Sequence, residues 1–480
     1  MPVLLERSWL LAAVVAPAAL LVGAAATVSP LMTVGAVVGA LVLAAAFLFP
    51  VAHLAVLLTL TAIVPYDLMN TYSLGGGSGN AGLLISDVFL LSGLTRAVAI
   101  LARERLRGFE AALLVATLGI LAVVVLQLLH GLRSGHAIGT AGNEARILLG
   151  FGTALIALSI VREPGGRGRL LRALLGAAIL LGVAGILQWF AGASFLGSGD
   201  FGVREGVSYT SEGRGQLQGG LYSYPIVVIV GFAALAALPP GSGGARTALL
   251  VAVALSAVGA LLTFERTFWV VAVLGCAFVA LRARRIQRGK VIVASITAAA
   301  IGLMLTAAFS PGTFTTARER LLSIGQYGSD NSVAYRLRES RFVAAEIREA
   351  PIDGSGLGAT VYWGRPSEGV QAEDLSYSHN GYLWLAWKIG IPAAILVFGL
   401  VAMAVLMRPA RNGEDPLMET ITVGCQGALF ALLVVNVTFP SVSALSSTPT
   451  AGVLLAFCAA GLTERFRAAA PQLVARPATA

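Results

Sequence analysis

From Ser8 to Ser29 the chain reads SWLLAAVVAPAALLVGAAATVS, and from Val291 to Phe309 it reads VIVASITAAAIGLMLTAAF. Neither stretch holds a charged residue, and each is close to the ~20 residues that cross a ~30 Å hydrocarbon core as a helix. Over the 480-residue chain 57% of residues are hydrophobic and only 12% are charged, whereas soluble domains carry about 25% charged residues. The strands of a membrane β-barrel would alternate in polarity, and these stretches do not. The predicted fold class is therefore all-α, a polytopic transmembrane helical bundle.

Apolar runs of this kind recur along the chain and predict about 12–14 membrane spans. The first three runs follow one another so closely that one of them could be re-entrant. We divide the chain into N-terminal transmembrane helices over 1–190, a core over 191–407, and C-terminal helices with a short tail over 408–480. The predicted spans lie at roughly 8–29, 31–49, 51–66, 83–101, 110–130, 145–161, 171–191, 221–239, 247–264, 267–281, 291–309, 381–407, 421–439 and 450–463.

The basic residues predict how the chain is oriented in the membrane. They gather in short segments between spans, as at 103–107, 162–172 and 282–290, and short loops rich in Lys and Arg face the cytoplasm. This rule puts both termini in the cytoplasm and the loops 192–220 and 310–378 on the extracytoplasmic side. The formal net charge of +9 is therefore explained by membrane orientation, and no nucleic-acid partner is predicted.

The long extracytoplasmic loop 310–378 holds seven Arg and nine Asp or Glu, which predicts a folded polar element. A helix is expected from Ser332 to Ala350, because polar residues can cap its start and Pro351 ends it. Its apolar face would lie down on the bundle. Beyond it, the glycine-rich turn 353–358 would let the backbone approach a ligand closely. The predicted apolar face consists of Val333, Leu337, Ser340, Ala344 and Ile347, and is polar only at Ser340.

Three residues at the outer ends of predicted spans are candidates for chemistry. Arg266 stands in the short hinge FERTFW between two spans, where its guanidinium either pairs with Glu265 or offers a planar fork of donors to a phosphate. Arg214 stands among glycines in the loop 192–220, either solvated or together with backbone N–H groups around an anion. His379 adjoins the long loop, either as a residue of the interfacial aromatic belt or as a general base.

Other kinds of site find no support in the sequence. Cys276, Cys425 and Cys458 lie inside apolar runs, where free cysteine behaves as a small hydrophobic residue, so neither a disulfide nor a metal site is predicted. No phosphate-binding glycine loop is present, and no cofactor is predicted. Asp87 and Arg96, in the fourth predicted span, are expected to pair with or neutralise each other inside the bundle.

Three segments resemble the O-antigen ligase and O-antigen polymerase family of membrane glycosyltransferases. The hinge ERTFW is similar to that family's Ser-Arg-Thr hinge, with Glu265 in place of the usual Ser. From Arg336 to Gly358 the chain resembles the family's pattern of Arg-Leu, a helix and Pro-x-x-Gly-x-Gly, with Ser340 where an aromatic is common. The run HNGYLWLAWKIGIP, which starts at His379, looks like the family's His-Asn run ending in Gly-x-Pro. The resemblance covers about 205–407.

The resemblance implies a glycosyltransferase C-type fold in the bacterial inner membrane. It implies an enzyme that moves a glycan from a polyprenyl (undecaprenyl) diphosphate donor to an acceptor hydroxyl on the extracytoplasmic face. Such transfer would invert the anomeric carbon without a metal or cofactor, and would build lipopolysaccharide or another cell-envelope polysaccharide. The acceptor would be a glycan or a lipid-linked molecule, membrane lipids would surround the protein, and ligase and polymerase stay undistinguished. The implied site consists of His379 as catalytic base, Arg214 and Arg266 as diphosphate ligands, and Arg336 and Asn380 as further candidates for substrate binding.

Three other kinds of protein remain open. A polysaccharide or lipid-linked glycan flippase has a similar number of spans, but such transporters usually show internal repeats and ionisable residues at the membrane midplane. No half-to-half repeat is evident here, and the polar groups gather at one interface. A glycosyltransferase of another family and a purely structural membrane protein are the other two. A cavity shared by Arg214, Arg266 and His379 would favour the transferase.

Overall fold

The computed structural model of the protein describes residues 30–64, 82–191, 203–204, 207–208, 222–238, 241–263, 265–283, 331–363, 373–409 and 416–474. Across these ranges the chain is almost wholly α-helical, with two short antiparallel hairpins. Five of the described helices are long and apolar enough to cross a membrane, namely Phe109–Arg133, Ile138–Val161, Gly166–Leu187, Gly243–Leu262 and Leu417–Val435. The prediction of an all-α polytopic membrane protein is confirmed. The predicted spans 8–29 and 291–309 lie outside the described residues.

The helices run in chain order through two groups. The first group is α2 (Pro30–Leu48), α3 (Pro50–Ile63), α5 (Ile85–Leu101), α6 (Phe109–Arg133), α7 (Ile138–Leu149), α8 (Thr153–Val161) and α9 (Gly166–Ala191), with a 3-10 turn η1 at Gly150–Gly152. The second group is α10 (Ser223–Ala237), α11 (Gly243–Leu262), α12 (Arg266–Arg282), α15 (Asn331–Glu349), α16 (Gly381–Ile389), α17 (Ile391–Leu406), α18 (Pro416–Val435) and α19 (Ser447–Val474), with a 3-10 turn η7 at Ser441–Ser443. The hairpins pair β1 (Val203–Arg204) with β2 (Val207–Ser208), and β3 (Val361–Trp363) with β4 (Glu373–Leu375).

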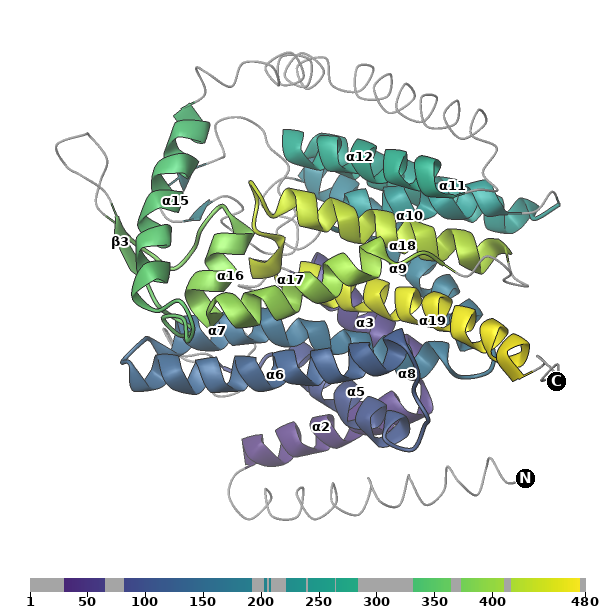
Figure 1. Ribbon diagram of the computed structural model, residues 1–480, viewed down its shortest axis with the longest axis horizontal. Coiled ribbons are helices and arrows are strands. Elements are labelled where there is room, and N and C mark those ends of the chain that lie inside the picture. The colour runs from purple at the N-terminus through teal and green to yellow at the C-terminus, as the bar shows by residue number, and fades with distance from the viewer. Residues whose placement is uncertain are drawn as a thin grey trace, which may run out of the picture.

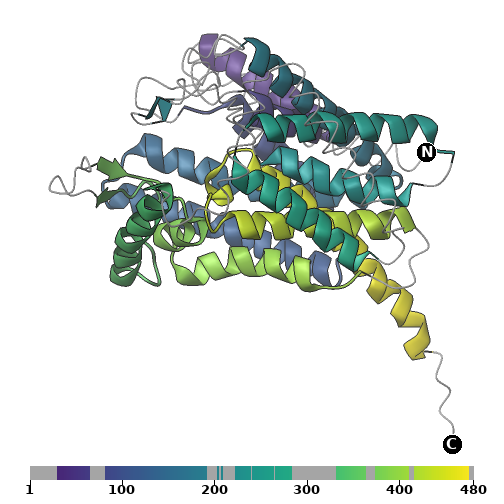
Figure 2. The same cartoon turned by 90° about the horizontal axis from the view of Figure 1, so that it is seen from above.

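Two helices, α8 and α18, lie at the centre of the bundle. Every residue of α8 is buried, because its sequence TALIALSIV is apolar all round and suits a position inside other helices. It packs against α5 and α19, while α18 packs against α10, α12, α17 and α19. Most of the long helices lie side by side in Figure 1, and α15 crosses them at one end. The view from above in Figure 2 again shows the green α15 at the end of the long helices.

The predicted span 381–407 is wrong as one continuous helix. It consists of α16 and α17, which are separated at Gly390, whose φ of 82° lies in the left-handed region. A Cβ at Gly390 would overlap the carbonyl oxygen of Ile352, and Pro392 stands in the first turn of α17, where proline is favoured. The helix breaks here because the turn that follows α15 packs backbone to backbone against this point.

The glycine-rich turn 353–358 is anchored on α6 and α16. The N–H of Leu357 donates to the carbonyl oxygen of Gln127 at 3.2 Å, and Gln127 Nε2 donates to the carbonyl oxygen of Asp353 at 2.6 Å. On the other side, the N–H of Gly356 donates to the carbonyl oxygen of Lys388 at 3.1 Å. The close backbone approach predicted from the glycines is therefore made to two helices of the bundle.

Gly131→Ala is expected to destabilise the protein by about 1–3 kcal/mol. A Cβ at Gly131 would overlap the carbonyl oxygen of Leu357, which belongs to the backbone and cannot rotate aside. The matched control is Gly119→Ala on the same helix, because its Cβ would lie 3.5 Å from the Leu396 side chain, in ordinary van der Waals contact, and alanine favours a helix. Thermal unfolding in detergent compares the two variants. A midpoint for Gly131→Ala at or above that of Gly119→Ala would contradict the anchored turn.

The helix predicted from Ser332 to Ala350 is present as α15, and it packs against α16 and β3. Its inward face differs from the predicted one. Glu339, Val343 and Ile347 are buried, whereas Leu337 is 61% exposed. The pattern of apolar residues alone does not predict a buried carboxylate on this helix. Glu339 nevertheless faces inward, because the backbone N–H and the ring of His379, just before α16, form hydrogen bonds with it.

Candidate functional site

His379 is held in place by Glu339, a buried carboxylate of α15. One Glu339 oxygen accepts the backbone N–H of His379 at 2.6 Å, and the other lies 2.6 Å from the ring Nδ1. The side chain of Glu339 is 3% exposed and that of His379 is 29% exposed. Burying a carboxylate is costly unless it is hydrogen-bonded, so Glu339 fixes the backbone and the ring of His379 together.

This pairing defines which nitrogen of the His379 ring can act as a base. Since a carboxylate accepts hydrogen bonds, Nδ1 carries the proton and Nε2 keeps its lone pair. The rings of Tyr335 and Tyr377 meet the imidazole edge-on, with centroid distances of 5.9 and 5.1 Å. An imidazole held in this way can accept a proton at Nε2, and the carboxylate then stabilises the imidazolium that forms.

Asn380 caps the helix that follows His379. Its side-chain oxygen accepts the N–H groups of Tyr382 and Leu383 at 3.0 and 3.1 Å, which is the usual work of an N-cap residue. The next residue, Gly381, donates its N–H to the carbonyl oxygen of Asn436 at 2.7 Å. These contacts stabilise the start of α16, and a direct contact of Asn380 with substrate stays a prediction.

Arg266 is the first residue of α12 and is partly buried. Two residues on, the ring of Phe268 packs against Tyr222 and Phe439, with centroid distances of 5.3 and 5.5 Å. Tyr222 directly precedes α10, and Phe439 follows α18. The ends of three helices that are distant in sequence therefore meet within a few residues of Arg266.

The start of α16 reaches the same end of α18. Besides the bond from Gly381 to Asn436, the hydroxyl of Tyr382 donates to the carbonyl oxygen of Leu433 at 2.7 Å. The start of α12, with Arg266, and the start of α16, two residues after His379, thus both adjoin the connection between α18 and η7. Arg214 lies outside the described residues, so the predicted meeting of all three side chains stays a prediction.

Arg336 stands one turn before Glu339 on α15. Residues three apart in a helix share a face, so the Arg336 side chain leaves α15 on the same side as Glu339. Its Nε is buried and has no hydrogen-bond partner within the part of the chain that the structure describes. A buried guanidinium nitrogen normally has an acceptor, and an anionic substrate would supply one.

A buried ion pair between Lys388 and Glu144, which was not predicted from the sequence, stabilises the far end of the helix that follows His379. Lys388 is fully buried, and its Nζ lies 2.7 Å from Glu144 Oε1 and also donates to the carbonyl oxygen of Ala359. The second Glu144 oxygen accepts the N–H of Gly358 at 2.7 Å. These contacts join α7, α16 and the turn after α15. Lys388 stands inside the predicted span 381–407, where a charge is costly unless it is paired. The sequence does not show that its partner is Glu144, because the two residues are 244 positions apart.

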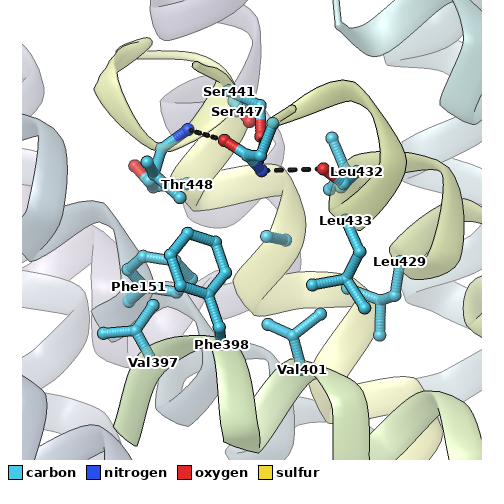
Figure 3. Close-up of a pocket in the computed structure, with 13 residues that line it drawn as sticks. Phe151, Val397, Phe398, Val401, Leu429, Leu432, Leu433, Ser441, Ser447 and Thr448 are labelled. Carbon is cyan, nitrogen blue, oxygen red and sulfur yellow. Dashed lines mark hydrogen bonds between the residues drawn. The ribbon is translucent and has the colours of Figure 1, made fainter. Parts of the chain in front are cut away.

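The small cavity shown in Figure 3 lies beside Ser441 and Thr448 at the same end of α18. Its volume is about 20 Å³, which is room for about one water molecule. Apolar side chains such as Phe151 and Val401 form most of its wall. None of the predicted site residues lines it, and it is too small for a sugar. Among the described residues no three His, Cys, Asp or Glu side chains are grouped so as to hold a metal ion.

Residues 251–398 match a family model described as O-antigen ligase. The match contains Arg266, Arg336, His379 and Asn380, together with Glu339, which the motif analysis did not single out. Arg214 precedes it. No match to a curated protein was found.

Proposed function

Because residues 251–398 match the family model described as O-antigen ligase, we propose that the protein is a membrane glycosyltransferase acting on a polyprenyl diphosphate-linked glycan. The glycan is moved to an acceptor hydroxyl on the extracytoplasmic face of the bacterial inner membrane. The observation that carries this proposal is the His379–Glu339 pair, which lies inside the matched region and has the geometry of an oriented general base.

The proposed reaction is a single displacement at the anomeric carbon of the donor. The acceptor oxygen forms a bond to that carbon as the bond from the carbon to the diphosphate oxygen breaks. The electron pair of the broken bond leaves with the polyprenyl diphosphate, and the acceptor proton passes to His379 Nε2. Attack from the side opposite to the leaving group inverts the carbon. Glu339 acts as a positioning residue, since it contacts the ring nitrogen that faces away from the acceptor.

Three arginines are proposed to bind the donor diphosphate. Arg266 opens α12, and the N–H groups at a helix start already favour an anion. Arg336 brings a guanidinium on the Glu339 side of α15, and Arg214 would add a third. A diphosphate gains negative charge as it leaves, and fixed cationic donors stabilise that charge more in the transition state than in the ground state.

Glu339→Gln is expected to lower kcat by about 10–100-fold, by analogy with the loss of a carboxylate that orients a metal-binding histidine. The amide keeps the size of the side chain but cannot hold Nδ1–H as a carboxylate does. Because Glu339 does not touch the donor, KM for the donor should be nearly unchanged. The control is Glu349→Gln, which removes the same charge from an exposed position on the same helix. Equal rates for the two variants would rule out the orienting role.

Transfer is expected to be unaffected by EDTA, because the arginines supply the positive charge that a metal ion often gives in reactions of diphosphates. The test uses purified protein with a polyprenyl diphosphate glycan and an acceptor, with and without the chelator. A loss of activity in EDTA that Mg²⁺ or Mn²⁺ restores would overturn this part of the proposal.

A further inference from the structure

A larger cavity lies at the end of the bundle opposite His379. Its volume is about 450 Å³, within the range of about 300–1,000 Å³ that ligand pockets usually have. The connection between α2 and α3, from Phe47 to Ala52, forms one wall, and Ile100 and Ala173 form much of the other. The wall is apolar apart from three charged side chains.

The position of this cavity follows from the contacts of α6. At the end of α6, Gly131 meets the turn that follows α15. At its start, Glu110 pairs with Arg162, which adjoins the cavity residue Glu163. The cavity and His379 are therefore separated by the length of α6. The basic segments 103–107 and 162–172 lie at this end of the bundle, and short loops rich in Lys and Arg face the cytoplasm, so this is the cytoplasmic end.

The three charged side chains of the cavity are Arg96, Glu163 and Arg169. Arg96 is 4% exposed and donates to Glu163 and, at 2.9 Å, to Ser159 Oγ. Arg169 is 48% exposed and lies 3.0 Å from the other Glu163 oxygen. The expected pairing of Arg96 with Asp87 is wrong, since Asp87 pairs with Arg146 at 2.8 Å.

The cavity carries more positive than negative charge. Among the described residues that line it, two guanidinium groups share the one carboxylate of Glu163. The neighbouring Arg162 pairs with Glu104 and Glu110. Excess charge next to an apolar wall at a membrane surface is costly unless an anion balances it. The half-exposed Arg169 stands where such an anion can reach it.

We propose that this cavity binds one anionic phospholipid of the cytoplasmic leaflet. The headgroup phosphate binds the half-exposed Arg169, and the buried Arg96 lies deeper in the cavity. The first part of an acyl chain packs against the apolar wall formed by α2, α3 and α9. Three observations favour this occupant over a soluble anion: the apolar wall, the position at the cytoplasmic end, and the abundance of anionic lipids in that leaflet. The site does not depend on the proposed transfer reaction.

The test is a titration of the full chain in detergent by native mass spectrometry, with phosphatidylglycerol and with phosphatidylcholine of identical acyl chains. Wild type is expected to bind phosphatidylglycerol more tightly than phosphatidylcholine. Arg169→Gln should weaken phosphatidylglycerol binding about fivefold, which is the effect of one basic residue at an anionic surface. Ala173→Phe, which places an aromatic ring against the apolar wall of the cavity, should strongly weaken binding of the acyl chain at this site.

The matched control is Arg246→Gln, which removes the same charge from an exposed position outside the cavity and should leave binding unchanged. A loss in Arg246→Gln equal to that in Arg169→Gln would mean general surface attraction and overturn the proposal. Both lipids carry a phosphate and differ in net headgroup charge, so equal binding would show that the cavity does not select an anionic lipid and would overturn the proposal. Competition by inorganic phosphate alone at the lipid concentration would show that the ligand is a soluble anion, which also overturns it.

Discussion

His379→Ala is expected to slow glycan transfer by about 10²–10⁴-fold, the range for the loss of a general base. The imidazole acts on the acceptor proton only as the new bond forms, so the donor should bind almost as tightly to the variant as to wild type. Transfer rates with purified protein, and donor affinity measured separately with a fluorescent polyprenyl diphosphate glycan, give the two quantities.

The control for this variant is His130→Ala, because His130 is exposed at the end of α6 and has no proposed part in the reaction. Both alanine variants should fold, as judged by their thermal unfolding. If His379→Ala retained full activity, His379 would be an interfacial aromatic-belt residue held by Glu339 for structural reasons alone.

Arg266→Ala is expected to lower kcat by about 10²–10³-fold, as the loss of one fixed donor to a developing negative charge does. Unlike the histidine variant, it should also weaken donor binding, because the diphosphate is charged before it leaves. Arg266→Lys should restore only part of the activity, since an ammonium cannot reproduce the planar fork of a guanidinium.

Two comparisons make the Arg266 result specific. Arg246→Gln serves again as a charge control, because Arg246 is exposed on the neighbouring helix α11. A donor that carries a monophosphate should lose less on Arg266→Ala than the diphosphate donor does. Unchanged donor affinity in Arg266→Ala would count against a diphosphate site at the start of α12.

The membrane helices could be predicted from the sequence because long uncharged runs admit few other structures. The helix at 331–349 was also predicted, from its polar start and Pro351. The break at Gly390 was not, since a glycine inside an apolar run is common, and only the packing of Ile352 against it demands the left-handed backbone.

The candidate site was only partly predictable. His379 and Arg266 stand at the ends of predicted spans, in segments that resemble motifs of O-antigen ligases, so both sequence and position pointed to them. Glu339 was not singled out, because it lies among the charged residues of a polar helix and its partner His379 is 40 residues later in the chain. Burial of Glu339 depends on which side of α15 faces the bundle. The apolar pattern of the helix predicted the wrong side, because Leu337 is exposed and Glu339 is buried.

The passage of the acceptor proton to His379, held by Glu339, is the step proposed to drive glycan transfer from a polyprenyl diphosphate. Its most direct test measures both products, the new glycoside and free polyprenyl diphosphate, from protein reconstituted in vesicles with donor and acceptor. Wild type should form the two products in equal amounts, Glu339→Gln should form both slowly, and His379→Ala should form both at least about 100-fold more slowly than wild type. Formation of both products by His379→Ala at the wild-type rate would contradict the role of His379 as the base, and glycoside formation without release of the diphosphate would contradict a polyprenyl diphosphate donor.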